Sequence, residues 1–234
     1  MNKRKMMKSL LAFILVLSFV LQLNAVNASA VTVTKTGWVS INSGTLTVRS
    51  GPGTSYKKVG SLKNNVSVTV YSQSKNGWSQ IGYNNKKAYV STQYLRMYSF
   101  LMDKTKVYTY RGEGSDYKSQ YRGKYYGWDK WNDGESSFVI KEDSKGLYFG
   151  WPESEYFTEL VYPLKVGKEW SEWGIKHKIT AMNGTLTTPA GTFKNVVTVK
   201  SSDGYTSYYA QNVGLLKTVS NGVTMSELVG LQKK

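Results

Sequence analysis

Short runs of β-branched and aromatic residues, separated by Gly, Asn and Ser, recur along most of the chain. Residues 45–49 alternate polar and apolar side chains, which is the pattern of a strand with one buried face. Pairs such as Asn84-Asn85 and Asn221-Gly222 suit the tight turns of hairpins, because Asn and Gly adopt positive φ at low cost. These features predict an all-β protein. The only helix that we allow for after the N-terminal segment is a short one at 168–173.

The N-terminal segment has a different composition. Residues 2–8 carry four positive charges and no negative ones, and a mostly apolar run follows over 10–23. Ala28-Ser29-Ala30 then supplies the small-x-small pattern that a signal peptidase cleaves. The apolar run is shorter than the roughly 20 residues that a membrane-spanning helix needs. We therefore predict that residues 1–30 are a cleavable signal peptide, and that the mature protein is secreted, extracellular or in the cell wall, without a stable membrane anchor.

Charge divides the rest of the chain. Residues 31–98 contain nine Lys and Arg and no Asp or Glu, whereas residues 99–234 contain 18 basic and 15 acidic residues. We therefore predict a basic domain at 31–98 and a nearly balanced one at 99–234. A compact unit with nine cations attracts polyanions in a salt-dependent way. The chain has no cysteine, so each domain must be held together by its core, without disulfides.

The first domain carries a family pattern. Residues 46–56, Leu-Thr-Val-Arg-Ser-Gly-Pro-Gly-Thr-Ser-Tyr, resemble the opening of bacterial SH3 (SH3b) domains. Later pieces follow in order, so the resemblance covers about residues 37–95. It departs at Ala88, where the family commonly has Gly followed by Trp, and here Tyr89 takes the aromatic position. The resemblance implies an SH3-like small barrel that targets exported proteins to peptidoglycan or other wall polymers.

Candidate binding residues in this domain are aromatic rings near turns and one arginine. The rings can stack on sugars or pack on peptide stems, and Arg49 can pair with a carboxylate or phosphate. Trp78 is equally well explained as part of the small core, and Arg49 as a residue that determines the fold. The electrostatics also suit teichoic acid, phospholipid headgroups or nucleic acid, but we do not expect nucleic acid as the partner of an exported protein. The candidate wall-polymer site comprises Arg49, Tyr56, Trp78, Tyr83 and Tyr89.

Residues 99–234 predict further short strands in a meandering antiparallel sheet. Three phrases, at 162–170, 188–197 and 209–217, resemble a pattern found in exported bacterial proteins of unassigned role. The resemblance implies a curved antiparallel sheet of the kind seen in lipoprotein-carrier-like folds, and it implies no activity. An additional ligand or protein partner is expected here.

Few residues of the second domain suit catalysis or metal binding. His177 stands between two lysines without a neighbouring triad motif. One histidine and no cysteine cannot form a familiar structural zinc site, and Trp131 and Ile140 occupy positions that a calcium loop reserves for ligands. Two carboxylate pairs suit a glycosidase acid and base: Glu153 with Glu155, and Glu169 with Glu172. We expect no cofactor, no metal and no catalytic residue.

The leading hypothesis is a secreted, non-catalytic cell-envelope binding protein. Its basic domain would bind peptidoglycan or teichoic acid, and its second domain would bind another ligand or partner. Two alternatives remain open, a cell-wall hydrolase that uses one of the carboxylate pairs and a carrier of apolar ligands.

Overall fold

The computed structural model describes residues 34–112, 114–132 and 136–234. The predicted signal peptide at residues 1–30 lies outside the described residues. The described chain forms two antiparallel sheets and no α-helix, which confirms the all-β prediction. Within these residues, no helix has the length and hydropathy that crossing a membrane requires.

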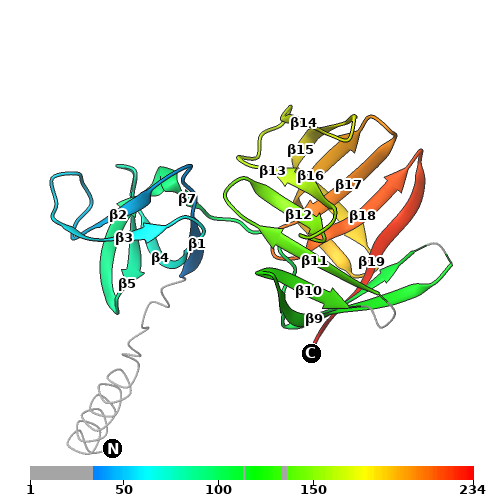
Figure 1. Cartoon of the computed structure of the whole chain (residues 1–234), viewed down its shortest axis with the longest axis horizontal. Coiled ribbons are helices and arrows are strands. Elements are labelled where there is room, and N and C mark those ends of the chain that lie inside the picture. Colours follow the sequence, from blue (N-terminus) through cyan, green and yellow to red (C-terminus); the bar gives the residue numbers. More distant parts are fainter. Residues whose placement is uncertain (1–33, 113, 133–135) are drawn as a thin grey trace, which may run out of the picture. The chain divides into compact units, whose positions relative to one another are not determined.

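The first sheet, drawn from blue to teal in Figure 1, has seven strands in the order β3-β2-β6-β5-β4-β1-β7. Its strands alternate between buried and more exposed residues, so one face supplies a small aliphatic core that includes Val48, Ile81 and Val90. The elements are β1 (Lys35–Val39), β2 (Thr45–Arg49), β3 (Lys58–Lys63), β4 (Ser67–Gln73), β5 (Trp78–Tyr83), β6 (Lys86–Ser91), a 3-10 turn η1 (Thr92–Tyr94) and β7 (Leu95–Arg96).

The hairpin turns of this sheet lie where Asn and Gly predict them. Asn84 and Asn85 join β5 to β6 with φ of 49° and 59°, the left-handed conformation that Asn tolerates best after Gly. Asn65 before β4 and Gly77 before β5 also have positive φ, 63° and 82°. Local turn chemistry therefore sets the register of the strands.

The second sheet contains twelve strands, drawn from green to red in Figure 1. From β8 to β13 and from β14 to β19 each strand pairs with the next one in the chain, and β8 pairs with β19, so the sheet is nearly closed. The strands are β8 (Lys106–Arg111), β9 (Asp116–Tyr125), β10 (Trp128–Asn132), β11 (Ser137–Glu142), β12 (Gly146–Gly150), β13 (Tyr156–Val161), β14 (Glu169–Glu172), β15 (Ile175–Thr188), β16 (Gly191–Ser201), β17 (Tyr205–Ala210), β18 (Gly214–Ser220) and β19 (Val223–Lys233).

The two edges of this sheet, β13 and β14, are joined by side chains. The carboxylate of Glu172 accepts hydrogen bonds from the backbone N–H and the hydroxyl of Thr158, at 2.8 and 2.9 Å. Trp170 Nε1 donates to the Thr158 carbonyl at 3.1 Å. The helix allowed for at 168–173 was therefore wrong: β14 is a strand, whose alternating Trp170 and Glu172 reach across to the opposite edge.

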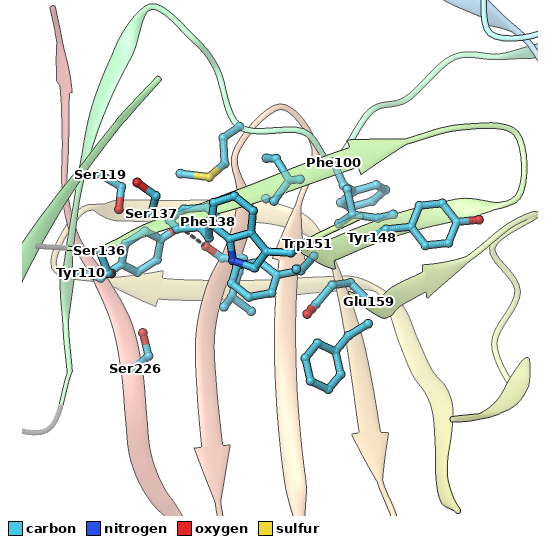
Figure 2. A pocket seen from close by; sticks show the side chains of 18 of the residues that line it. Phe100, Tyr110, Ser119, Ser136, Ser137, Phe138, Tyr148, Trp151, Glu159 and Ser226 are labelled. Carbon is cyan, nitrogen blue, oxygen red and sulfur yellow. Dashed lines mark hydrogen bonds between the residues drawn. The ribbon is translucent and has the colours of Figure 1, made fainter. Parts of the chain in front are cut away.

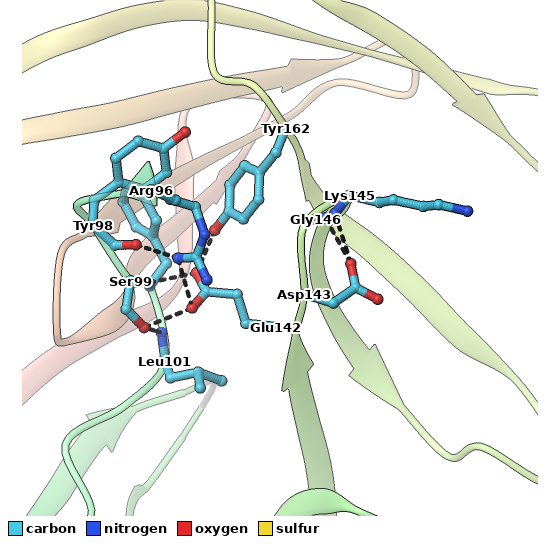
Figure 3. A network of polar contacts seen from close by, with 10 residues as sticks. Arg96, Tyr98, Ser99, Leu101, Glu142, Asp143, Lys145, Gly146 and Tyr162 are labelled. Carbon is cyan, nitrogen blue, oxygen red and sulfur yellow. Dashed lines mark hydrogen bonds and ion pairs between the residues drawn. The ribbon is translucent and has the colours of Figure 1, made fainter. Parts of the chain in front are cut away.

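A buried polar cluster lies where the chain leaves β7 (Figure 3). The guanidinium of Arg96 forms an ion pair with Glu142 of β11 at 3.0 Å, and the two side chains are 5% and 1% exposed. Glu142 also accepts hydrogen bonds from Ser99 Oγ at 2.7 Å, from the Phe100 N–H at 2.9 Å and from the hydroxyl of Tyr162. Each charge in this dry environment is therefore neutralised, as buried charges must be.

Candidate functional site

Four polar side chains line up across the first sheet. Arg49 of β2 stands opposite Lys58 of β3 and Tyr89 of β6, and Tyr89 stands opposite Gln80 of β5. The strand neighbours of Arg49, Gln80 and Tyr89, such as Val48 and Val90, are buried, so these three lie on the face opposite the core, and Lys58 is placed beside them by its pairing with Arg49. We call Lys58, Arg49, Tyr89 and Gln80 the outer row.

Hydrogen bonds hold the outer row in place. Gln80 Nε2 donates to the Tyr89 hydroxyl at 2.7 Å, which fixes the tilt of that ring. Arg49 Nη1 donates to the carbonyl of Tyr56 at 2.8 Å, which ties the loop between β2 and β3 to the row. No other hydrogen bond or ion pair of Arg49 occurs among the described residues, so the rest of its guanidinium is available to an anion.

The structure separates the predicted site residues into two groups. Trp78, half-buried, follows the same face of β5 as Gln80, so it lies beside the outer row. Tyr56 is 47% exposed, and its ring covers Gly51, where an added Cβ would lie only 2.2 Å from the ring. Tyr83 points to the other face: it packs against the core of the first sheet, and its hydroxyl covers Gly60. Arg49 and Tyr89 are thus strand neighbours, Trp78 lies on the same face, and Tyr56 is joined to Arg49 through its carbonyl, whereas Tyr83 lies on the core face.

The cations of the first sheet are largely uncompensated. Of the nine predicted from the sequence, Arg96 is paired with Glu142. No ion pair to a carboxylate is formed, within the described residues, by the other eight. Lys87 lies 5.3 Å from the centre of the Tyr71 ring, a cation–π contact that leaves its charge intact. The eight are Lys35, Arg49, Lys57, Lys58, Lys63, Lys75, Lys86 and Lys87.

An antiparallel sheet with this strand pattern and this loop after β2 is what the resemblance implied. Residues 44–96 match the family model of the bacterial SH3 domain. The prediction of that family is confirmed for this part of the chain, and the remainder matches no family model. No curated protein and no solved structure matches the chain. For the residues beyond the SH3 domain, only their own structure informs a function.

The second sheet lines a cavity of about 770 Å³ that is partly open to solvent (Figure 2). Most of its lining is aromatic or aliphatic, with rings such as Phe100, Phe138 and Trp151. In Figure 2, hydroxyl groups that include Ser119 and Ser226 lie at one side of the cavity, and Glu159 lies at the other side beyond the Trp151 ring. The cavity is therefore apolar along its middle and polar toward both ends.

Glu159 is the charged group deepest in this site. It lies in β13, and the Tyr209 hydroxyl of β17 donates a hydrogen bond to its carboxylate. Burial raises the pKa of Glu159, and the nearby charge of Glu172 raises it further, against the opposing effect of the Tyr209 hydrogen bond. A smaller cavity of about 360 Å³ shares Glu159 and Tyr209 in its wall. These two side chains thus mark the border between the cavities.

The carboxylate pairs considered for catalysis are engaged separately. Glu153 accepts a hydrogen bond from Tyr125, while Glu155 lines the larger cavity. Glu169 is paired with Lys178 at 2.9 Å on the solvent side of β14, and residues three apart on a strand point to opposite faces. Glu172 is accordingly on the inner side, where it binds Thr158.

His177 stacks on Trp170, with ring centres 5.3 Å apart, in the wall of the smaller cavity. Among residues 34–112, 114–132 and 136–234, no group of three His, Asp or Glu side chains is arranged to hold a metal ion.

Sequence reasoning did not single out Ser119, Glu159 or Tyr209. One signal was available for Glu159, because it is an acidic residue inside the strand-forming run Tyr156–Val161. Whether its side chain points inward depends on the register of the strand, however. The six residues of this strand are too few for their polar and apolar alternation to show which face is buried. Ser119 carries no local signal at all.

Proposed function

We propose that this protein is an exported, non-catalytic cell-envelope binding protein, which its SH3 domain directs to anionic wall polymers or peptidoglycan. The family of that domain suggests a wall-binding module, and the signal-like segment at residues 1–30 supports export. The observation that carries the proposal is the set of eight cations of the first sheet and its loops that have no acidic partner among the described residues, two of which, Lys58 and Arg49, lie in the outer row. A domain with that surface gains free energy by meeting a polyanion.

The outer row supplies a contact of two kinds. Lys58 and Arg49 provide positive charge, and Arg49 presents a planar fork that suits phosphate or carboxylate. Tyr89 provides an aromatic surface between Arg49 and Gln80, and a sugar ring can pack on it. The charged contact should weaken with salt, whereas the aromatic contact should not.

Sedimentation with purified cell walls tests the proposal. We compare the intact protein with the double variant Lys58→Gln/Lys87→Gln, over a salt series and with walls stripped of teichoic acid. The control is Lys165→Gln/Lys194→Gln, which removes two exposed lysines of the second sheet and the same total charge. At about 1 kcal/mol per lysine near an anionic surface, the first variant should bind roughly thirtyfold more weakly at low salt.

Three results would contradict this function. The first is that the intact protein stays in the supernatant at low salt, and the second is that both double variants bind equally well. The third is turnover: clearing of a peptidoglycan suspension by the purified protein would contradict the non-catalytic part. If binding survives both high salt and removal of teichoic acid, the aromatic surface of Tyr89 and peptidoglycan itself become the determinants.

A further inference from the structure

The larger cavity of the second sheet has a charge opposite to that of the chain. Glu155 and Glu159 line it, and no Lys, Arg or His is among the described residues of its wall. The whole chain carries a net charge of +16. Glu155 is exposed, so Glu159 is the one carboxylate of the described lining that is placed where desolvation makes its charge costly.

Glu159 retains unused hydrogen-bonding capacity. An ionised carboxylate accepts about four hydrogen bonds, and within the described structure the only one that Glu159 accepts comes from Tyr209. The remaining lone pairs border the cavities. A cationic or hydrogen-bond-donating group of a ligand would bind to these lone pairs. The carboxylate of a ligand would be repelled by the negative charge of Glu159.

A second polar group is without a partner at the other side of the cavity. Ser119 is fully buried, lines the cavity, and its hydroxyl has no hydrogen-bond partner. Leaving such a group unpaired costs about 1–3 kcal/mol. It lies far from Glu159 in Figure 2, with the rings of Phe138 and Trp151 between them.

We propose that this cavity binds an elongated apolar molecule with an amine at the end that meets Glu159 and a hydroxyl or similar polar group at the end that meets Ser119. The volume of about 770 Å³ lies within the range of about 300–1,000 Å³ that is typical of small-molecule sites. The aromatic middle of the cavity accommodates the hydrocarbon body. Fatty acids and other molecules that end in a carboxylate are disfavoured. This site is separate from the outer row and does not depend on wall binding.

Titration with three probes of equal chain length tests the head-group preference. Decylamine, decanol and decanoate are each added to the purified protein at neutral pH, below the concentrations at which they form micelles. Isothermal calorimetry measures affinity, and a change in the intrinsic tryptophan fluorescence, to which Trp151 in the cavity wall contributes, reports on occupancy. We expect decylamine to bind at least tenfold more tightly than decanoate, with decanol between them. The net charge of +16 acts the other way, so adsorption to the surface cannot imitate this order.

Two variants locate the effect. Glu159→Gln should reduce the affinity for decylamine to that for decanol, because the amide keeps the shape and removes the charge. Glu153→Gln is the matched control, since this exposed carboxylate bonds to Tyr125 outside the cavity lining. It should leave all three affinities unchanged. Amino alcohols of increasing length test the other end: the best of them should bind more tightly than the matching alkylamine, and Ser119→Ala should remove only that gain.

The proposal is overturned if none of the three probes binds, or if decanoate binds as tightly as decylamine. It is also overturned if Glu153→Gln and Glu159→Gln change the affinities equally. None of these results bears on the sedimentation of the protein with cell walls, so the two proposals fail independently.

Discussion

Glu142 is the residue whose replacement should destabilise this protein most clearly. Its side chain is 1% exposed and forms the buried ion pair with Arg96 (Figure 3). The rings of Trp38 and Tyr162, each 5.1 Å from the guanidinium carbon, separate Arg96 from water. Glu142→Gln keeps the size of the side chain and removes its charge. The variant therefore leaves the Arg96 cation buried without a counter-ion.

The expected loss follows from that desolvation. Removing one partner of a buried ion pair costs about 3–5 kcal/mol, because the other charge remains in a dry environment. For a chain of 234 residues, 1 kcal/mol lowers the melting temperature by about 2–4 °C, so the expected decrease is about 6–20 °C. Circular dichroism during heating measures it. Asp116→Asn is the matched control, because it breaks an arginine–aspartate pair in which both side chains are largely exposed.

A double variant separates charge burial from packing. Arg96→Met with Glu142→Met removes both charges and should recover most of the stability, since buried pairs are often replaced by apolar residues without loss. If Glu142→Gln lowers the melting temperature no more than Asp116→Asn does, the pair is not buried in solution. That result would refute the reasoning from its exposure.

Two further predictions concern the second sheet. Gly146→Ala should lower the free energy of unfolding, measured in urea, by about 1–3 kcal/mol, because a Cβ there would lie 2.2 Å from the Leu160 carbonyl oxygen. Gly184→Ala is the control, because its Cβ would lie 3.4 Å from the nearest atom. Equal losses in the two variants would contradict the close approach of Leu160 to Gly146. Glu159→Gln should stabilise the unliganded protein at neutral pH, because burial raises the pKa of Glu159 and its ionisation in the folded state therefore costs free energy. The gain in stability should shrink as the pH falls through the pKa of Glu159 in the folded state. It should vanish below pH 4.5, the pKa of the unfolded state, because the wild-type carboxyl is then protonated in both states. A gain that does not change with pH would contradict a raised pKa of Glu159.

The elements of the first sheet were largely predictable because their signals are local. Residues 45–49 form β2 as the alternation indicates, and the Asn84-Asn85 turn joins β5 to β6. Both depend on residues that are neighbours in the chain. The resemblance to the SH3 family then predicted how the remaining strands follow one another, which the sequence of no single strand indicates.

The strands of the second sheet were harder to predict where the backbone departs from regular pairing. β15 runs from Ile175 to Thr188, through Asn183-Gly184, a pair that usually indicates a turn. In the structure this pair forms an irregularity within the strand and no turn. The register with β16 shifts between Ala181 and Thr185, and the strand continues. Long-range pairing with β16 outweighs the local turn preference here.

Closure of the sheet was also beyond sequence reasoning. The edges meet through Trp170, Thr158 and Glu172, and these contacts depend on which face of β13 and β14 each residue occupies. Closure determines that Glu159 and Ser119 line the same cavity. The cavity therefore follows from the arrangement of all twelve strands, and no segment of the chain indicates it alone.

The separation of charge between the two sheets explains why the net charge of the chain does not by itself indicate what the second sheet would bind. A net charge of +16 suggests anionic partners for the whole molecule. The segment 31–98, however, has nine cations and no acidic residue to balance them, and the second sheet places Glu159 inside with no basic residue in the described lining of the larger cavity. Long-range attraction depends on the total charge, whereas selection within a cavity depends on the few groups that a bound molecule touches. The two proposals are therefore compatible: a polyanion would be attracted by the total charge at one surface, and an amine would be selected by Glu159 inside the second sheet.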